Sequence, residues 1–443
     1  MRGGSKAAAA VALAIVLGIA GCSGSPAARS GDPVLSDGNL ALIEDAMHEV
    51  ERDYVVPVTQ DKLVDGALKG MLSRLDPHSD YMTETEYREL MGTTSGEFGG
   101  IGIEISVEQG VPQVISAIDG TPAATAGIEP GDRIVKADGH PLVGMEIGEV
   151  VRRLRGPPGS RVVLTIARAN RGEFDVPITR AVIHVRSVKY ALEPGRIGYA
   201  RISMFDENTP RELRAALLRL RQKAGGHLTG FVLDLRNDAG GLLDAAVSVA
   251  GDFFDGGTVV STRGRQPDEN QVYNAPANGD LLDGAPMVVL INGASASASE
   301  IVAGALQDRG RATIMGTRSF GKGSVQSIIP IAGHGALRLT TALYYTPSGR
   351  SIQGQGITPD RIVLLPKDEQ VANALMTYES DLFGTLKPTG ALAPTGKAPA
   401  PATASGAEAA HPIKPKDIGT AHDAQLRAAV GLLGGRRAAA AMR

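Results

Sequence analysis

The sequence predicts an α/β core that follows a small β-rich domain and a helical N-terminal segment. Three patterns indicate this arrangement. From residue 198 onward, apolar strand-like stretches alternate with helical stretches, which is typical of a sheet with parallel strand pairs. Residues 98–183 carry short alternating stretches separated by glycine- and proline-containing turns, as β-strands do. Residues 40–90 repeat apolar residues at three- and four-residue steps, as helices do.

Length and composition narrow the class of protein. A chain of 443 residues usually forms two or three domains with buried cores, so it requires no disulfide or metal scaffold. Its 45 basic and 48 acidic residues leave a net charge of −3, which argues against a nucleic-acid-binding surface. The one cysteine, Cys22, excludes an intramolecular disulfide and a cysteine-cluster metal site.

Residues 1–22 are similar to a lipoprotein-type signal peptide. Two basic residues precede the apolar run 7–20, which suits the core of a secretory signal and is short for a membrane span. The run ends in Ile19-Ala20-Gly21-Cys22, which resembles a bacterial lipobox, where the cysteine is lipidated and becomes the mature N-terminus. The alternative is a signal with an incidental cysteine. We expect export to the cell envelope or periplasm, a membrane anchor on Cys22 and a tether over residues 23–37.

The structured elements follow in order. A helical region, residues 38–95, is interrupted at Asp76-Pro77-His78-Ser79, and the β-rich domain covers residues 96–183. The α/β core covers residues 184–366. Its strands are expected at residues 199–203, 231–235, 287–291 and 312–315, and its helices at residues 242–254 and 297–307 and from residue 209 onward.

The C-terminal part is less regular. Residues 367–384 carry no pattern that assigns them to a domain. Residues 385–416 are rich in Ala and Pro and are predicted to be a disordered linker, and residues 417–443 are expected to contain a short helix.

A serine cluster joins a buried strand of the core to a helix. Ser295, Ser297 and Ser299 alternate along this junction. A serine at such a strand–helix junction is exposed at the end of the sheet, close to helix N–H groups that favour negative charge. Spacing alone does not choose among the three serines, and a helix N-cap is the structural alternative.

A lysine between two glycines is the second candidate group. Residues 316–324 nearly match the phosphate-binding pattern G-x-x-x-x-G-K-[ST], but Gly323 replaces the required hydroxyl residue and a strand-like stretch follows. No histidine lies in a setting typical of a catalytic base. If a serine is the nucleophile, Lys322 is therefore the leading base, provided that burial lowers its pKa.

Two further glycines lie in the turn between the strand at residues 231–235 and the helix that follows it. Gly240 and Gly241 allow backbone N–H groups to approach a ligand closely, as an oxyanion hole requires. A simple helix-entry turn is the alternative.

Together these segments resemble the carboxy-terminal processing, or tail-specific, proteases of the S41 serine peptidase family, over residues 40–365. The resemblance implies a crotonase/Clp-like S41 protease core with a PDZ domain. The matching motifs are Asp76–Tyr81, Phe98–Gly102, Gly198–Ser203, Asp234–Gly241, Ser295–Asp308, Arg318–Gln326 and Thr346–Gly354.

The resemblance implies a Ser/Lys dyad assisted by a glutamine, without metal or cofactor. The family places the lysine 25 residues after the serine and the glutamine four residues further on, and Ser297, Lys322 and Gln326 have these intervals. Ser297 would attack the peptide carbonyl, Lys322 would take its proton and later protonate the leaving amine, and Gln326 would orient Lys322.

The resemblance also implies an oxyanion hole formed by backbone N–H groups at Gly240, Gly241 and Ala298. Family members often have Asn-Pro before the two glycines, whereas this chain has Asp238-Ala239. A change of these side chains leaves the backbone N–H groups of the glycines in place, so an oxyanion hole is still expected here.

In the PDZ domain, the resemblance implies that Gly99, Gly100, Ile101 and Gly102 form a carboxylate-binding loop, where a substrate tail would add a strand to the sheet. A plain β-hairpin start is the alternative. The expected partners are protein substrates with apolar C-terminal tails, a helical-repeat adaptor, the membrane and further copies of this chain.

The sequence thus favours an exported serine endopeptidase. Two rival hypotheses are a catalytically silent PDZ scaffold lipoprotein and a phosphate-binding enzyme that uses residues 316–322.

Overall fold

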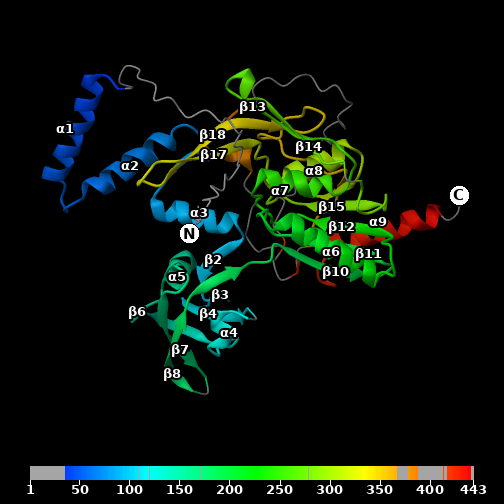
Figure 1. Cartoon of the computed structure of the whole chain (residues 1–443), viewed down its shortest axis with the longest axis horizontal. Coiled ribbons are helices and arrows are strands. Elements are labelled where there is room, and N and C mark those ends of the chain that lie inside the picture. The colour runs from blue at the N-terminus through cyan, green and yellow to red at the C-terminus, as the bar shows by residue number, and fades with distance from the viewer. Residues whose placement is uncertain are drawn as a thin grey trace, which may run out of the picture. The chain divides into compact units, whose positions relative to one another are not determined.

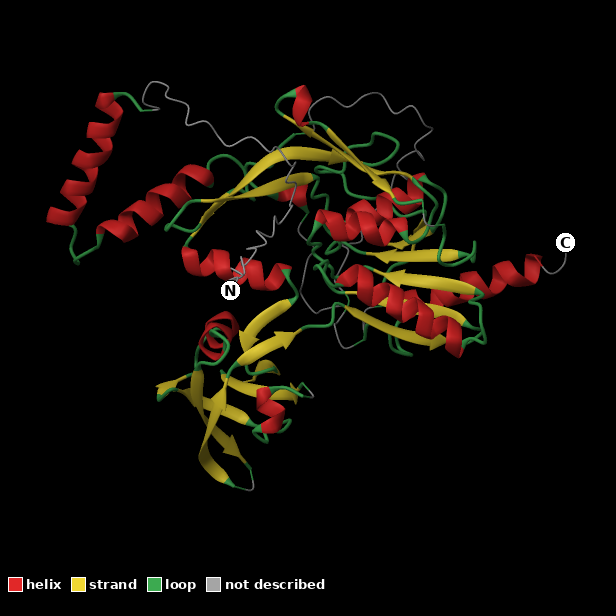
Figure 2. Cartoon of the chain, in the orientation of Figure 1, coloured by secondary structure: helices red, strands yellow, loops and turns green. Residues whose placement is uncertain are grey.

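The computed structural model describes residues 35–108, 110–118, 120–169, 171–277, 279–366, 378–387, 413 and 417–440. They form two compact units, one of residues 88–186 and one of the flanking stretches up to residue 87 and from residue 187. Figure 1 colours the chain by residue number, and Figure 2 shows the helices and strands of each unit. The expected signal peptide lies outside the described residues, as do most of the tether and of the linker 385–416.

The unit of residues 88–186 is built on a six-stranded antiparallel sheet and a separate two-stranded pair. Along β7 (Arg161–Arg168) Val162, Leu164 and Ile166 are buried, because alternate side chains of a strand point to the same face. They form one core with Val150 and Leu154 of helix α5 (Ile147–Leu154). The other elements are β2 (Glu97–Gly100), β3 (Ile103–Glu108), β4 (Val111–Ala117), α4 (Pro122–Thr125), β5 (Arg133–Ala137), β6 (His140–Pro141), β8 (Gly172–Thr179) and β9 (Ala181–His184).

The other unit contains a six-stranded sheet in the order β10-β11-β12-β15-β16-β19, in which all neighbours after β11 are parallel. The strands β12 (Gly230–Asp234) and β15 (Met287–Ile291) are buried throughout, because helices cover both faces of the sheet. The other strands are β10 (Val188–Glu193), β11 (Ile197–Ile202), β16 (Thr313–Gly316) and β19 (Arg361–Ile362).

Two hydrophobic cores lie on opposite faces of this sheet. One face packs on α6 (Thr209–Lys223), α7 (Leu243–Gly251) and α8 (Ala298–Asp308). The other face packs on Leu426, Ala429 and Leu433 of the C-terminal helix α9 (Ala424–Ala440), drawn in red in Figure 1. The predicted α/β core and β-rich domain are confirmed.

A second, antiparallel sheet of this unit was not predicted from the sequence. Its strands are β1, β13, β14, β17 and β18, and β18 pairs with β1, β13 and β17. Their bounds are β1 (Asp80–Met82), β13 (Gly257–Gly264), β14 (Gln271–Ala275), β17 (Ser324–Pro330) and β18 (Ala336–Tyr345). The sequence indicated a strand-like stretch only for β17, and two of the three partners of β18, β1 and β13, are distant from it in the chain.

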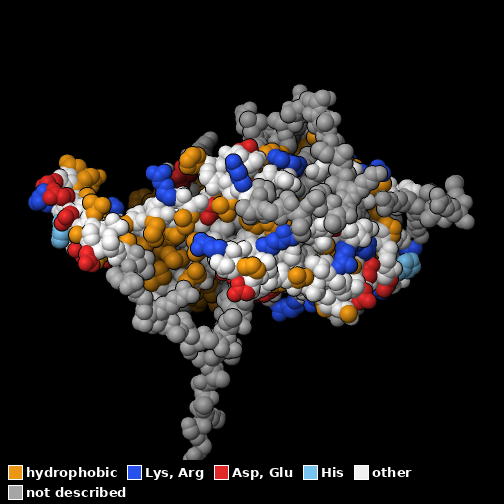
Figure 3. All heavy atoms as spheres, turned by 90° about the horizontal axis from the view of Figure 1, so that it is seen from above, with side chains coloured by type: hydrophobic (Ala, Val, Ile, Leu, Met, Phe, Trp, Pro, Cys, Tyr) orange, Lys and Arg blue, Asp and Glu red, His pale blue; other side chains and the backbone are white. Residues whose placement is uncertain are grey.

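The N-terminal helices are α1 (Asp37–Asp53), α2 (Gln60–Leu72) and α3 (Glu84–Thr94). Helix α1 buries no residue, and several apolar side chains of this region are exposed, which Figure 3 shows in orange among charged groups at the left. None of the described helices is both long enough and apolar enough to cross a membrane.

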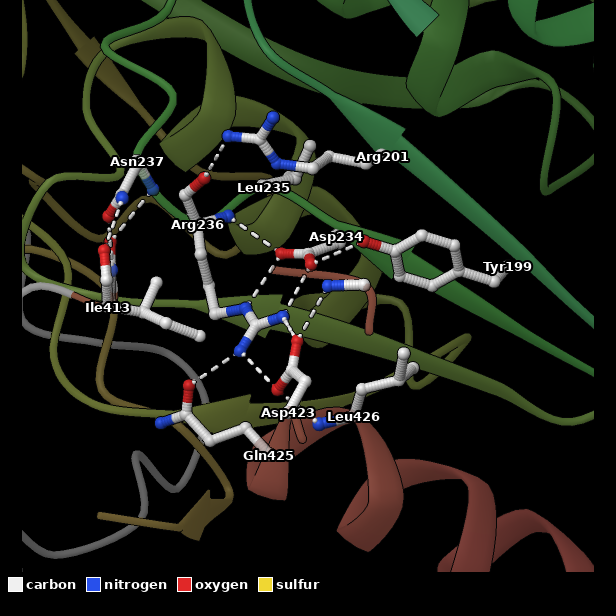
Figure 4. A network of polar contacts seen from close by, with 12 residues as sticks. Tyr199, Arg201, Asp234, Leu235, Arg236, Asn237, Ile413, Asp423, Gln425 and Leu426 are labelled. Atoms are coloured by element: carbon white, nitrogen blue, oxygen red, sulfur yellow. Dashed lines mark hydrogen bonds and ion pairs between the residues drawn. The ribbon is translucent and has the colours of Figure 1, made fainter. Parts of the chain in front are cut away.

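The C-terminal helix is joined to the central sheet by a buried ionic network (Figure 4). The Arg236 guanidinium lies between the carboxylates of Asp234 and Asp423, with Nη2–Oδ2 distances of 2.6 and 2.5 Å, and all three side chains are fully buried. Gln425 accepts a further hydrogen bond from Arg236 at 2.9 Å. Burial opposes the ionisation of Asp423, but the hydrogen bonds and charge of Arg236 outweigh it and hold the pKa of Asp423 below its ordinary value.

We expect Asp423→Asn to lower the free energy of unfolding by roughly 3–5 kcal/mol, because removing one partner of a buried ion pair leaves charge uncompensated. Urea unfolding followed by circular dichroism measures the change. The matched control is Asp283→Asn, which breaks a largely exposed pair with Arg221 and should cost about 1 kcal/mol or less. Equal losses of unfolding free energy in the two variants would contradict a stabilising role of the buried network.

Candidate active site

Ser297 lies on a tight turn between β15 and α8. Its φ of 56° and ψ of −114° are rare for a residue other than glycine and cost backbone strain. The turn is held by Glu300 of α8, which accepts a hydrogen bond from the Ser297 N–H at 2.9 Å. This arrangement presents the Ser297 side chain at the N-terminus of a buried helix.

The structure distinguishes the three serines, among which spacing alone could not choose. Ser295 and Ser299 are fully buried, and their hydroxyls donate to the backbone carbonyls of Leu235 at 2.8 Å and Asp238 at 3.0 Å. Both hydroxyls therefore stabilise the junction. Ser297 is only partly buried and lines a pocket.

The pocket at Ser297 has a volume of about 30 Å³. Gln326 of β17 and Gly241 line it together with Ser297, so the structure brings these three predicted site residues together. Tyr344, which the sequence did not single out, lines it too and donates a hydrogen bond to the backbone carbonyl of Lys322. Burial raises the pKa of Tyr344 well above its ordinary value, and a hydrogen bond with the Ser297 side chain opposes the shift.

Lys322 lies in the loop before β17 and is mostly buried. Burial lowers the pKa of its amine, as does the positive charge of Arg338, whereas Glu379 opposes the shift. Lys322 is not among the residues that line the pocket, and no hydrogen bond joins its Nζ to Ser297 Oγ within the described part of the chain. The structure therefore places the lysine loop at the site without a formed Ser–Lys contact.

Glu300 joins the serine turn to the lysine loop. Its buried carboxylate accepts hydrogen bonds from Ser319 Oγ at 2.5 Å, Gly321 N at 2.7 Å and Lys322 N at 2.9 Å, in addition to Ser297 N. Burial raises the pKa of Glu300 to about 7, although these donors favour the ionised form. The sequence analysis missed this residue, yet its place three residues after Ser297 matches the S-x-x-E pattern of a helix start.

The glycines expected at an oxyanion hole lie against Ser297. A Cβ on Gly240 would fall 2.8 Å from both Ser297 Cβ and Ala298 N, so this backbone and the start of α8 are in direct contact. The Gly240 N–H donates to Asp238 Oδ1 at 2.9 Å, whereas Gly241 lines the pocket. Asp238 is fully buried, which raises its pKa to about 7. The Gly240 N–H, also expected at the oxyanion hole, is engaged by Asp238 in this structure, and the N–H groups of Gly241 and Ala298 remain predictions for it.

The turn at residues 76–79, which the sequence identified as a helix break, is linked by hydrogen bonds to the loop that carries Lys322. His78 Nε2 lies 2.7 Å from Oε2 of the fully buried Glu379. The other carboxylate oxygen of Glu379 accepts from Gln353 at 2.8 Å, and Gln353 accepts from the N–H of Gly323 beside Lys322. The sequence left residues 367–384 unassigned, so it missed this contact.

In the smaller unit, a pocket of about 220 Å³ lies between the start of the sheet and α5. Gly100, Ile101 and Gly102 of the predicted loop line it, whereas the Gly99 carbonyl accepts a hydrogen bond from Gly156 at 3.1 Å. The other lining residues are mostly apolar: Phe98, Ile103, Ile105, Ile147, Val151, Leu154 and Arg155.

Among the described residues, no cluster of three or more His, Cys, Asp or Glu side chains could hold a metal ion.

Comparison with known proteins defines the class. Residues 196–363 match peptidase family S41, residues 113–168 match the PDZ domain, and residues 24–86 match the N-terminal domain of the activating protease CtpB. The fold and these matches define a protease with a PDZ domain.

The chain belongs to peptidase family S41, as a C-terminal processing protease. It is 48% identical to the carboxy-terminal-processing protease of Bartonella bacilliformis over 399 residues, which cover 89% of this chain and 88% of that protein. It is 34% identical to the carboxy-terminal processing protease CtpA of Bacillus subtilis, over 85% of this chain and 80% of that one. Among solved structures, the photosystem II D1 C-terminal processing protease is 29% identical with a TM-score of 0.44, covering 75% of this chain and 95% of that one.

We expect Gly240→Ala to lower proteolytic activity by about 100-fold, because the new Cβ would lie 2.7–2.8 Å from Ala296 O and Ala298 N and would displace the serine turn. Gly349→Ala is the matched control. Gly349 also has a positive φ, 82°, but a Cβ there would meet nothing within 4 Å. Initial rates on an unfolded protein substrate measure the effect, and similar losses in both variants would show that backbone strain alone is responsible.

Proposed function

We propose that this protein is an exported serine endopeptidase that recognises the C-terminal tails of its protein substrates and cleaves them through a Ser297–Lys322 dyad. The observation that carries this proposal is the shared carboxylate of Glu300, which binds the backbone N–H groups of both residues at 2.9 Å. A nucleophile turn and a base loop are thereby held together beside one pocket.

The chemistry requires a neutral amine on Lys322. Burial and Arg338 lower the pKa of Lys322, which favours this form. The amine would approach Ser297 when substrate binds and take the proton of Oγ as this oxygen attacks the peptide carbonyl. The N–H groups of Gly241 and Ala298 would stabilise the negative oxygen that forms.

The tetrahedral intermediate would then collapse. The carbon–nitrogen bond breaks, Lys322 returns its proton to the leaving amine, and the acyl group stays on Ser297 Oγ. Water, deprotonated by Lys322, attacks the ester and releases the second product, which restores the hydroxyl of Ser297.

Tail recognition is assigned to the smaller unit. Its pocket of about 220 Å³ is lined mainly by Ile, Val and Leu side chains and lies beside Gly100–Gly102. Backbone N–H groups of such a loop suit a terminal carboxylate, and the apolar lining suits an apolar last side chain. A helical-repeat adaptor and assembly with further copies of this chain stay predictions.

Ser297→Ala and Lys322→Ala should each reduce cleavage by at least about 1,000-fold, because they remove the nucleophile and its base. The assay incubates the detergent-solubilised full chain with an unfolded protein that ends in an apolar tail, and with the same protein ending in Asp-Asp, which should be cut more slowly. The control is Ser327→Ala, which changes a half-buried serine of β17 that does not line the pocket.

The other outcomes discriminate between the rival functions. Cleavage that persists in both variants would contradict the dyad. Tail binding by a wild-type chain that cleaves nothing would support a silent PDZ scaffold, and activity that requires added nucleotide would support a phosphate-binding enzyme.

Export and anchoring are part of the same proposal and rest on the lipobox-like Ile19-Ala20-Gly21-Cys22. Cys22→Ala should move the protein from the membrane fraction to the soluble cell-envelope fraction, because the acyl chains have no other attachment point. Fractionation with immunoblotting measures this shift, and Ser23→Ala serves as the control. A Cys22→Ala protein that stays in the membrane fraction would contradict the lipid anchor.

A further inference from the structure

The side-chain amide of Gln326 is anchored by two hydroxyl groups. Its Nε2 donates to Ser324 Oγ at 2.9 Å and to Thr340 Oγ1 at 3.2 Å. An amide nitrogen has two hydrogens, so both are used. The oxygen Oε1 is therefore the group that Gln326 can offer to the pocket that it lines with Ser297.

The direction of the bond from Gln326 to Thr340 is set by a third residue. Thr340 Oγ1 donates to Asp76 Oδ1 at 3.0 Å. A hydroxyl has one hydrogen, and an ionised carboxylate only accepts. Thr340 must therefore accept from its other neighbour, and Gln326 must turn its nitrogen, not its oxygen, towards Thr340.

Asp76 is held firmly enough to set this direction. It is 5% exposed and accepts hydrogen bonds from the backbone N–H groups of His78 at 2.9 Å and Ser79 at 3.0 Å. Ser79 Oγ lies 2.6 Å from Asp76 Oδ2 and 3.4 Å from Thr340 Oγ1, so its proton goes to the nearer carboxylate. Ser79 Oγ in turn accepts from Thr340 N at 3.0 Å, which docks the turn on β18.

We propose that Asp76 and Thr340 are positioning residues that act through Gln326, by turning its amide oxygen towards the amine of Lys322. This inference rests on the dyad proposed above. A neutral amine has two N–H groups and one lone pair, and an N–H donated to Gln326 Oε1 leaves the lone pair for the hydroxyl of Ser297. A reversed amide would present N–H groups to the amine and orient it wrongly. The end of the N-terminal helical segment is thus part of the active site.

Thr340→Val tests the proposal, because it removes the hydroxyl and nearly preserves the shape of the side chain. We expect kcat to fall roughly 10- to 100-fold, with KM within about twofold of wild type, since Thr340 is not among the residues that line the pocket at Ser297. Thr340→Ser keeps the hydroxyl and should restore most of kcat. Thr341→Val is the matched control, because the hydroxyl of exposed Thr341 pairs with Ser327 across the same two strands. This variant should leave kcat unchanged.

A double-mutant cycle separates positioning from a general structural role. If Thr340 acts through Gln326, the double variant Thr340→Val/Gln326→Ala should have the kcat of Gln326→Ala alone. A wild-type kcat in Thr340→Val, or losses that multiply in the double variant, would overturn the proposal. Full activity of Lys322→Ala would overturn the dyad, and this proposal with it. Full activity of Thr340→Val beside an inactive Lys322→Ala would overturn this proposal alone.

Discussion

The buried carboxylate of Glu300 is the contact on which the site depends. It accepts hydrogen bonds from four donors, on the serine turn and on the lysine loop, at 2.5–2.9 Å. Removing a carboxylate from water is costly, and only donors in place offset that cost. The two loops therefore satisfy Glu300 when they lie together and leave it unsatisfied when they separate. This carboxylate thus determines both the stability of the site and the distance between the serine turn and the lysine loop.

The site lies where the two sheets of the larger unit meet. The central parallel sheet supplies Ser297 through β15 and α8, and the antiparallel sheet supplies Gln326 through β17. Segments that precede β1 and follow β19 support it, since the turn at residues 76–79 and the buried Glu379 bind each other through His78 at 2.7 Å. These two segments are therefore structural parts of the protease unit, and their contacts converge on the strands that carry the lysine loop.

Much of the fold could be predicted because its signals are local. The apolar stretches that became β12 and β15 are continuous, as expected of strands buried on both faces, and β7 alternates as expected of a half-buried strand. The antiparallel sheet could not be predicted as a whole, because β18 joins β1 and β13 to it across long stretches of sequence. Asp76 and Thr340 are 264 residues apart, and no spacing pattern relates them.

The sequence by itself determined the α/β core and the β-rich domain, since these follow from local periodicity. The candidate groups Ser297, Lys322 and Gln326 followed from the resemblance to the S41 family, whose intervals they match. Only the tertiary structure decided which groups are free to react. It engages the hydroxyls of Ser295 and Ser299 in buried hydrogen bonds, and it lowers the pKa of Lys322 through burial and Arg338. Burial and hydrogen-bond partners come from residues remote in sequence, so the reactivity of a side chain is a property of the folded chain.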